Sequence, residues 1–269
     1  MSMATLGLNE LLTALALPPS TQVQQRVPKK MLAENSAASL ADRKLVQDRI
    51  EELTWQAVLK PTNVGVAAYV DELRSYLEVA VLVARLRTEA APSGQVNQQG
   101  AKVSASVKRV AELVHRAVPY PTLLVLEDGP QMFASMAHIR WAQREAEKTV
   151  LDGDPIIVPV TLAAEPEVFL EAMALSKQPR SQMLALYQGW FDTLSAWQAV
   201  ELTGQFKPSE TPAQAAERRA ALHTCKDLDA RIAAARSAAA KEKQIARQVA
   251  LNMEIKGLLA ERQRVAQSL

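Results

Sequence analysis

The histidines are the first place to look for chemistry in this chain, because imidazole is the side chain that most readily acts as a base or a metal ligand near neutral pH. His115, His138 and His223 each occur singly, with no second metal ligand at a characteristic spacing. The motifs G-x-x-x-x-G-K-[ST], G-x-G-x-x-G, G-x-S-x-G and H-E-x-x-H are absent from the sequence. We therefore expect no catalytic residues, no metal site and no cofactor, and structural or surface roles for the histidines.

Carboxylates offer an enzymatic alternative, a nuclease in which strand-borne acidic residues and a lysine bind Mg²⁺. The E-x-K or D-x-K spacing of such a site is missing, because neither Glu78 nor Glu127 is followed by a lysine two residues later. We keep a nuclease with a degenerate site as an alternative hypothesis. It would draw on Asp71, Glu72, Glu78, Glu127 and Asp128.

Three cations, Arg26, Lys29 and Lys30, cluster in a proline-rich stretch that should be a loop, extended or turned. Contact with a phosphate backbone needs only positive charge held in place, so these residues could bind nucleic acid or phosphate. The alternative is that they pair with carboxylates of the following helix.

Composition sets the cellular context. The single cysteine, Cys225, excludes an internal disulfide and a cysteine-based zinc cluster. The first twenty residues lack a basic region and are interrupted by Pro18 and Pro19, so they predict a short amphipathic helix rather than a signal peptide. No apolar run approaches the roughly 18 residues of a membrane span. We expect a cytoplasmic protein without membrane contact.

Helical periodicity and β-rich runs alternate in the first half of the chain. Residues 6–16 predict a first helix, and residues 39–59 predict a second, capped by Ser39 or Asp42. Residues 64–87 fit either strand or helix, and their β-branched content favours strand. The apolar residues that would share one face of this strand are Val79, Val81 and Val83.

The clearest strand is residues 122–128, an apolar run bounded by turn residues. Residues 131–142 should return as its hairpin partner, and residues 156–162 add a strand that Pro159 places at an edge. With an amphipathic helix over residues 102–117, these elements predict an α+β fold. Its small, mostly antiparallel sheet would have four or five strands, with helices on one face.

Everything after residue 165 predicts helix, including residues 167–177 and 181–203, the latter stopped by Gly204. We expect three regions, an α+β domain over 1–162, a helical packing region over 163–210 and a long coiled-coil-like tail over 211–269. The tail holds eleven Lys and Arg against six Asp and Glu, a net charge of +5. Because the whole chain has a net charge of +2, residues 1–210 carry a net charge of −3.

The tail begins with Thr211 as a helix cap and Pro212 as the first helical residue. Its apolar residues follow heptad spacing in two blocks whose frames differ, which indicates a stutter or a change of packing partner. One continuous helix would be about 85 Å long. It must therefore fold back as a hairpin or pair with another chain. The expected contact residues are Ile232, Leu251, Asn252, Ile255, Leu258 and Val265, with Asn252 a polar residue that could fix register.

Several segments in this order resemble the bacterial family called domain of unknown function 4391. They are LPPSTQV (17–23), RVPKK (26–30), LKPT (59–62) after Trp55, RAVPYP (116–121) and EKQIARQVALNMEIK (242–256). The family favours an aromatic residue where this chain has Ile245 and Ala246, so packing there should differ. The resemblance implies a genomic context beside DNA methyltransferases and helicases of restriction or phage-defence loci.

These patterns lead to a hypothesis of macromolecular contact. The chain would be a non-catalytic accessory or scaffold subunit of a DNA-modification or phage-defence assembly. Its tail would bind a helicase, a methyltransferase or a second copy of the chain, and the Arg26–Lys30 segment would contact nucleic acid or that partner. A self-associating structural protein is the third hypothesis beside the nuclease.

Overall fold

The chain forms an α+β fold. The computed structural model describes residues 6–36, 39–88, 103–142, 148–160 and 166–269. Its contacts divide the chain into two compact units, residues 1–194 and 195–269. The helices between 166 and 194 thus belong to the unit that holds the sheet. The expected boundary at 162 falls outside the described residues.

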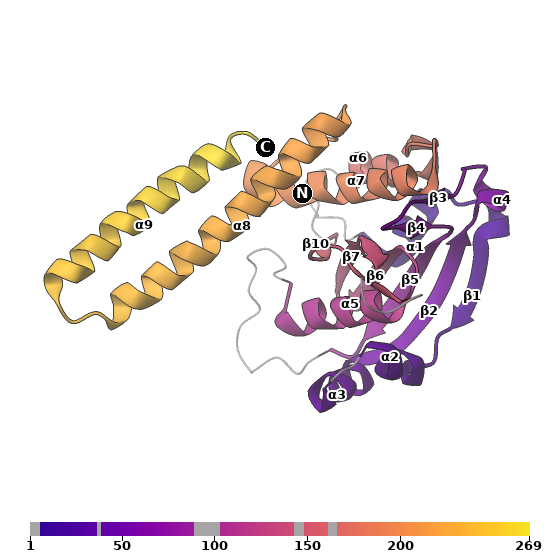
Figure 1. Ribbon diagram of the computed structural model, residues 1–269, viewed down its shortest axis with the longest axis horizontal. Coiled ribbons are helices and arrows are strands. Elements are labelled where there is room, and N and C mark those ends of the chain that lie inside the picture. The colour runs from indigo at the N-terminus through magenta and orange to yellow at the C-terminus, as the bar shows by residue number, and fades with distance from the viewer. Residues whose placement is uncertain (1–5, 37–38, 89–102, 143–147, 161–165) are drawn as a thin grey trace. The chain divides into compact units, whose positions relative to one another are not determined.

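A mixed sheet is the centre of the first unit, and among the described residues it has six strands in the order β1-β2-β5-β6-β7-β10 (Figure 1). Neighbouring strands are antiparallel except β5 and β6, which are parallel. The strands are β1 (Gln22–Arg26), β2 (Ile50–Leu59), β5 (Val79–Leu86), β6 (Thr122–Asp128), β7 (Gln131–Ala137) and β10 (Ile156–Pro159). Two short ladders pair β3 (Tyr69–Val70) with β4 (Ser75–Tyr76), and β8 (Ile139–Trp141) with β9 (Thr149–Leu151).

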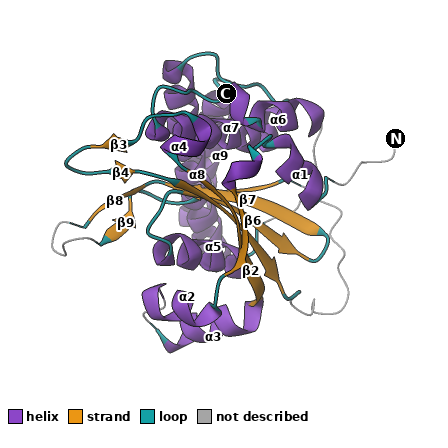
Figure 2. Ribbon diagram, turned by 90° about the vertical axis from the view of Figure 1, so that its right-hand side faces the viewer, coloured by secondary structure: helices purple, strands orange, loops and turns teal. Residues whose placement is uncertain are grey.

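Helices cover both faces of the sheet, not one face as expected from the sequence (Figure 2). One layer holds α2 (Lys29–Ser36), α3 (Leu40–Arg49) and α5 (Ala105–Ala117). The other holds α1 (Leu8–Ala14), α6 (Pro166–Met173) and the first part of α7 (Met183–Thr203). The reason lies in β5, where every side chain except Arg85 is buried, so that both faces of this strand need cover. The remaining short elements are α4 (Pro61–Val64), η1 (Pro19–Thr21) and η2 (Leu175–Lys177).

The predicted helix over 39–59 is only half correct. Ser39 caps α3 by accepting a hydrogen bond from the backbone N–H of Asp42 at 3.1 Å, but the chain turns into strand β2 at Ile50. The ladder between β2 and β5 is irregular at two places, between 50 and 52 and between 55 and 57. Such bulges shift the alternation of side chains, so the buried residues Ile50, Leu53 and Ala57 acquire a spacing that imitates a helix.

Other sequence predictions for this unit are confirmed. Residues 79–86 form a strand, β6 and β7 form the expected hairpin, and β10, which contains Pro159, lies at the edge of the sheet. The return strand expected over 131–142 ends at Ala137, however, because residues 139–141 form β8 and pair with β9 instead. The sheet exceeds four or five strands because β1 and β2 were expected to be loop and helix. Residues 161–162 of the expected third strand lie outside the described residues.

Buried polar contacts fix the helix layers to the sheet. On one face, the Tyr187 hydroxyl of α7 donates to the carbonyl oxygens of Ala137, at 2.8 Å, and Thr122, at 3.0 Å. On the other face, the His115 ring of α5 lies with its Nε2 atom 2.9 Å from the Ser135 hydroxyl of β7. Both contacts are fully enclosed, so each helix has one position against the strands.

The second unit contains the end of α7 and a helical hairpin. Gly204, with φ of 75°, ends α7 as expected. Thr211 then caps α8 (Pro212–Lys241) by accepting from the backbone N–H of Gln214 at 3.2 Å. A turn at residues 242–244 leads into α9 (Ile245–Ala266), which lies beside α8 (Figure 1). The tail thus folds back, which is the hairpin alternative of the sequence prediction.

His115 gives the fold a predicted pH dependence. Burial lowers the pKa of His115 from 6.5 to about 3. Because the folded pKa is depressed, the unfolded chain binds the proton first, so the contribution of His115 to stability is complete above pH 6.5 and declines as the pH falls towards 3. In this window the free energy of unfolding should fall by up to about 1.4 kcal/mol per pH unit more than in His115→Gln.

Urea denaturation at several pH values between 4 and 7 measures this difference. The assignment of His115 as a buried neutral group would be contradicted if the wild type and His115→Gln showed parallel pH profiles. His223→Gln is the matched control, since His223 is an exposed histidine on α8.

Candidate functional site

The predicted basic segment is not a loop. Arg26 is the last residue of the edge strand β1, and Lys29 and Lys30 are the first two residues of α2. Pro28 precedes the helix, and its carbonyl accepts from the N–H of Met31 at 3.0 Å. The three cations therefore occupy a strand end and a helix start on one side of the sheet, where their backbone is fixed.

Lys29 has a structural contact. Its ammonium group donates to the carbonyl oxygen of Ile50, the residue at which β2 begins. Desolvation lowers the pKa of Lys29 below its usual value, and the positive charges of Arg87 and Arg26 lower it further. This hydrogen bond joins the start of α2 to the start of β2. Because one of the donors of the Lys29 ammonium group is used in it, fewer remain to bind a ligand.

Neighbouring cations hold the adjoining helix in place. Arg49, at the end of α3, forms a buried ion pair with Asp128 at 2.8 Å, and the guanidinium of Arg87 donates to the carbonyl oxygens of Gln47 and Asp48 at 2.9 and 3.0 Å. Removing either partner of a buried ion pair such as Arg49 and Asp128 leaves an unpaired charge in the protein interior. These contacts fix α3 to the ends of the central strands.

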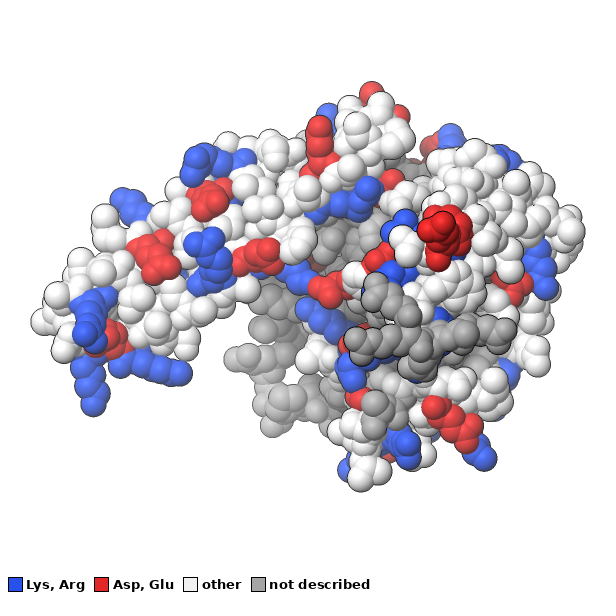
Figure 3. All heavy atoms as spheres, in the orientation of Figure 1, with Lys and Arg blue, Asp and Glu red and all other residues white. Residues whose placement is uncertain are grey.

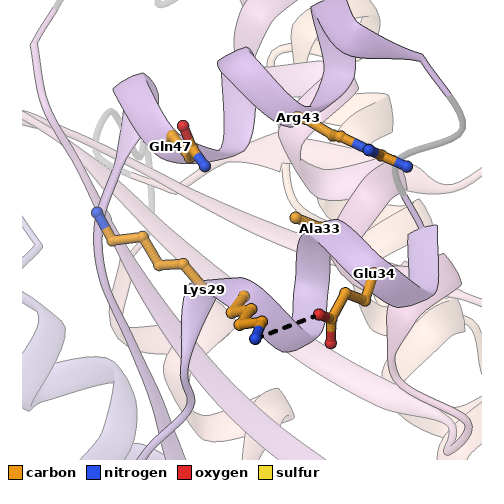
Figure 4. A pocket seen from close by; sticks show the side chains of 6 residues that line it. Lys29, Ala33, Glu34, Arg43 and Gln47 are labelled. Carbon is orange, nitrogen blue, oxygen red and sulfur yellow. Dashed lines mark ion pairs between the residues drawn. The ribbon is translucent and has the colours of Figure 1, made fainter.

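A shallow hollow of about 390 Å³ lies between α2 and α3. Its lining residues are Lys29, Lys30, Ala33, Glu34, Arg43 and Gln47. Figure 4 shows that Lys29 and Arg43 extend in opposite directions from the two helices. Lys30 forms an ion pair with Glu34 at 3.7 Å, four residues along the helix. The cations do not converge on one point, so the hollow offers a positive surface rather than a pocket for a single phosphate.

Arg26 is also near a carboxylate, since its Nε atom lies 3.9 Å from Glu52. The contacts of Arg26 and Lys30 are those of the structural alternative, except that Glu52 belongs to a strand and not to the following helix. Both side chains remain largely exposed, at 70% for Arg26 and 84% for Lys30. Phosphate contact by these residues stays a prediction.

The acidic residues of the nuclease alternative are dispersed. Glu78 precedes β5 and pairs with Lys60 at 3.4 Å, whereas Glu127 is the second-last residue of β6 and pairs with Arg85 at 3.0 Å. The β5–β6 register aligns Arg85 with Glu127, so Glu78 lies seven residues, about 20 Å, from that level. These two carboxylates could not share a metal ion. Among the described residues, no group of three or more potential metal ligands gathers.

The histidines also lie apart. His115 is in the core, and Nδ1 of His138 is 2.7 Å from the hydroxyl of Tyr76 beside the buried ring of Tyr187. His223 is exposed on α8, 3.3 Å from Asp227. Each histidine therefore has a local structural environment of its own.

The hairpin fully buries two of the six predicted contact residues and half-buries three others. Ile232 of α8 and Leu258 of α9 are buried with Leu228, and Val265 packs against this cluster. A bidentate pair between Arg262 and Asp229 crosses the same interface. Leu251 and Ile255 are half-buried, and Asn252 is exposed, so Asn252 does not lie in the seam between α8 and α9.

The α9 helix carries a second apolar face that the heptad analysis missed. Ile245, Val249 and Met253 are exposed by 78%, 55% and 65%. At about 100° per residue these three share one side of the helix, and Leu258 lies about 180° from Val249. We call Ile245, Val249 and Met253 the outer stripe. Their i, i+4, i+8 spacing was present in the sequence, but the expected heptad frame followed the opposite face.

Positive charge surrounds the turn between the two helices (Figure 3). Lys241, Lys243 and Arg247 are exposed there. The nearby Glu242 uses its Oε1 atom to accept from the backbone N–H groups of Lys243 and Gln244, both at 2.8 Å. The turn is thus an ordered, cationic end of the hairpin, directly before the outer stripe.

Lys29 and Lys30 should differ in their effect on stability. Lys29→Met removes a charged donor from a backbone carbonyl and should lower the free energy of unfolding by about 1–2 kcal/mol. Lys30→Met removes an exposed pair within one helix and should change it by less than about 0.5 kcal/mol. Urea denaturation of both variants measures the difference, and equal effects would contradict the structural role of Lys29.

In the part of the chain that the structure describes, no helix has the length and apolar content to cross a membrane. None of the curated proteins and none of the solved structures is significantly similar to the chain. The family model described as domain of unknown function (DUF4391) matches residues 15–261. Because the match covers most of the sequence, the chain belongs to the DUF4391 family.

Proposed function

We propose that this protein is a cytoplasmic, non-catalytic accessory subunit of a bacterial DNA-modification or phage-defence assembly, and that its helical hairpin is the element that binds a partner protein. The outer stripe carries this proposal. Three large apolar side chains on one face of a helix expose hydrophobic area that the hairpin itself leaves uncovered. Apolar anchors three or four residues apart on one face are a common means by which a helix binds a protein groove.

The surroundings of the stripe support binding to a protein. Asn252 flanks the stripe about 60° from Val249, and Lys256 follows it on the same side of the helix. Both residues are exposed. An apolar centre with a polar and charged rim is the composition of protein interfaces. The genomic context that the family resemblance implies makes a helicase or a DNA methyltransferase of the same locus the expected class of partner.

The arrangement of carboxylates supports a non-catalytic role. Glu78 and Glu127 lie at opposite ends of the sheet, each beside a cation. A metal-dependent nuclease needs carboxylates that converge on a bound metal ion, and these two are too far apart to do so.

Nucleic-acid contact is a second proposed function of the same subunit, and Arg26 and Lys30 would supply it. The supporting observation is their exposure on fixed elements beside the hollow between α2 and α3. Lys29 adds positive charge nearby, but its ammonium group donates to the carbonyl oxygen of Ile50. Charge reversal in Arg26→Glu/Lys30→Glu should weaken DNA binding and reduce its salt dependence, by about one phosphate contact for each residue. Unchanged affinity for DNA and for the partner protein would remove this assignment.

Partner binding can be tested with the intact chain. The triple variant Ile245→Ser/Val249→Ser/Met253→Ser should lower the affinity for the helicase or methyltransferase of the same locus at least about tenfold, because each buried apolar anchor contributes more than 1 kcal/mol. Calorimetry with the purified partner measures the affinity, and circular dichroism verifies the helix content.

A control triple variant replaces three exposed apolar residues of the other unit, Val70→Ser/Leu73→Ser/Leu77→Ser. It should retain wild-type affinity. If the two triple variants bound the partner equally well, the hairpin would not be the docking element.

A further inference from the structure

A charged residue lies beyond each end of the outer stripe, Glu242 in the turn before α9 and Lys256 within α9. Glu242 lies three residues before Ile245, and Lys256 lies three residues after Met253. The order along the chain is therefore acid, apolar, apolar, apolar, base, with spacings of three, four, four and three. This pattern reads the same in both directions except that the charges at its two ends are opposite.

Such a pattern is self-complementary. If two copies of α9 lie antiparallel about a two-fold axis at Val249, Val249 meets its own copy and Ile245 lies opposite Met253 of the second copy. The carboxylate of Glu242, which the backbone N–H groups of Lys243 and Gln244 hold at the start of α9, then lies near Lys256 of the second copy, and the symmetry produces this pair twice. A parallel arrangement would instead place Lys256 beside Lys256. A surface that pairs with itself about a two-fold axis is the requirement for an isologous dimer.

Both end charges have capacity for a further ion pair. Lys256 is exposed, and no carboxylate of the described residues lies within ion-pair distance of it. Glu242 accepts both backbone N–H groups of the turn with Oε1 alone, which fixes its carboxylate at the start of α9 and leaves Oε2 without a contact among the described residues. The stripe from Ile245 to Met253 is about 12 Å long, so Glu242 and Lys256 bracket it closely.

We propose that the outer stripe of α9 binds the same stripe of a second copy of this chain, as an antiparallel dimer with its two-fold axis at Val249. The inference rests on the proposed function, since it concerns the surface assigned there to protein binding. The second copy occupies the outer stripe when the larger partner is absent, and the two compete for it. Three side chains cover much less than the ~800 Å² per partner of a standard interface. The dimer is therefore weak and forms in proportion to concentration.

Light scattering or sedimentation of the full chain over a range of concentrations tests the dimer. The average mass should rise from 29.4 kDa towards twice that value as concentration increases. Met253→Lys should hold the mass at that of one chain. Lys256→Glu should raise the dissociation constant about tenfold, because the symmetry removes two ion pairs at once.

Two controls match these variants. Val70→Lys makes the same kind of change at an exposed apolar residue of β3, and Arg231→Glu reverses a charge on exposed α8. Both should dimerise like the wild type. A wild-type mass of 29.4 kDa at every soluble concentration, or equal effects of Lys256→Glu and Arg231→Glu, would overturn the dimer.

Two outcomes distinguish a failure of the dimer hypothesis from a failure of the proposed function. A monomeric wild type that still binds the helicase or methyltransferase through the outer stripe would refute the second copy as the occupant and keep the docking role. A dimer that binds neither protein would support the pairing described here and contradict the assignment to a defence assembly.

Discussion

The α9 helix has apolar side chains on two opposite faces, and a two-helix hairpin can cover only one of them. Leu258 and Val265 pack against Leu228 and Ile232 of α8, which buries the inner face. The outer stripe then remains in water at 55–78% exposure. A helix that is apolar on both sides is ordinarily enclosed by other protein. The exposed outer stripe of α9 is therefore the surface most in need of a protein partner.

In the sheet unit, by contrast, polar side chains are buried, where they attach the helix layers to the sheet. Tyr187 and His115 attach one helix to each face, and the buried pair of Arg49 with Asp128 joins the end of α3 to β6. These contacts hold α2 and α3 in place, so that Arg26 and Lys30 present their charges from fixed positions. The unit is thus a rigid support for surface contacts.

Part of this architecture could be predicted from local sequence. Four features depend only on the residues themselves and their immediate neighbours. They are strand β6, the end of α7 at Gly204, the start of α8 at Thr211 and the edge position of Pro159. Strand β2 could not be predicted, because its two bulges gave Ile50, Leu53 and Ala57 a helical spacing.

The contact residues were harder to predict because their roles depend on packing between distant segments. Lys29 was expected to face phosphate, but its ammonium bonds to Ile50, 21 residues further along the chain. In α9, the heptad frame followed the face that contains Leu258, and that face is used within the hairpin. The residues left for a partner, Ile245, Val249 and Met253, were recognisable only once α8 had been placed.

Disulfide trapping at the proposed axis tests most directly whether the outer stripe binds the same stripe of a second copy. In a Cys225→Ala background, Val249→Cys should form a cross-linked dimer under mild oxidation, because the two thiols meet at the two-fold axis. Ala234→Cys, at an exposed position of α8, should remain largely monomeric. Equal yields from the two variants, or no cross-link from Val249→Cys, would contradict the pairing of two copies through the outer stripe.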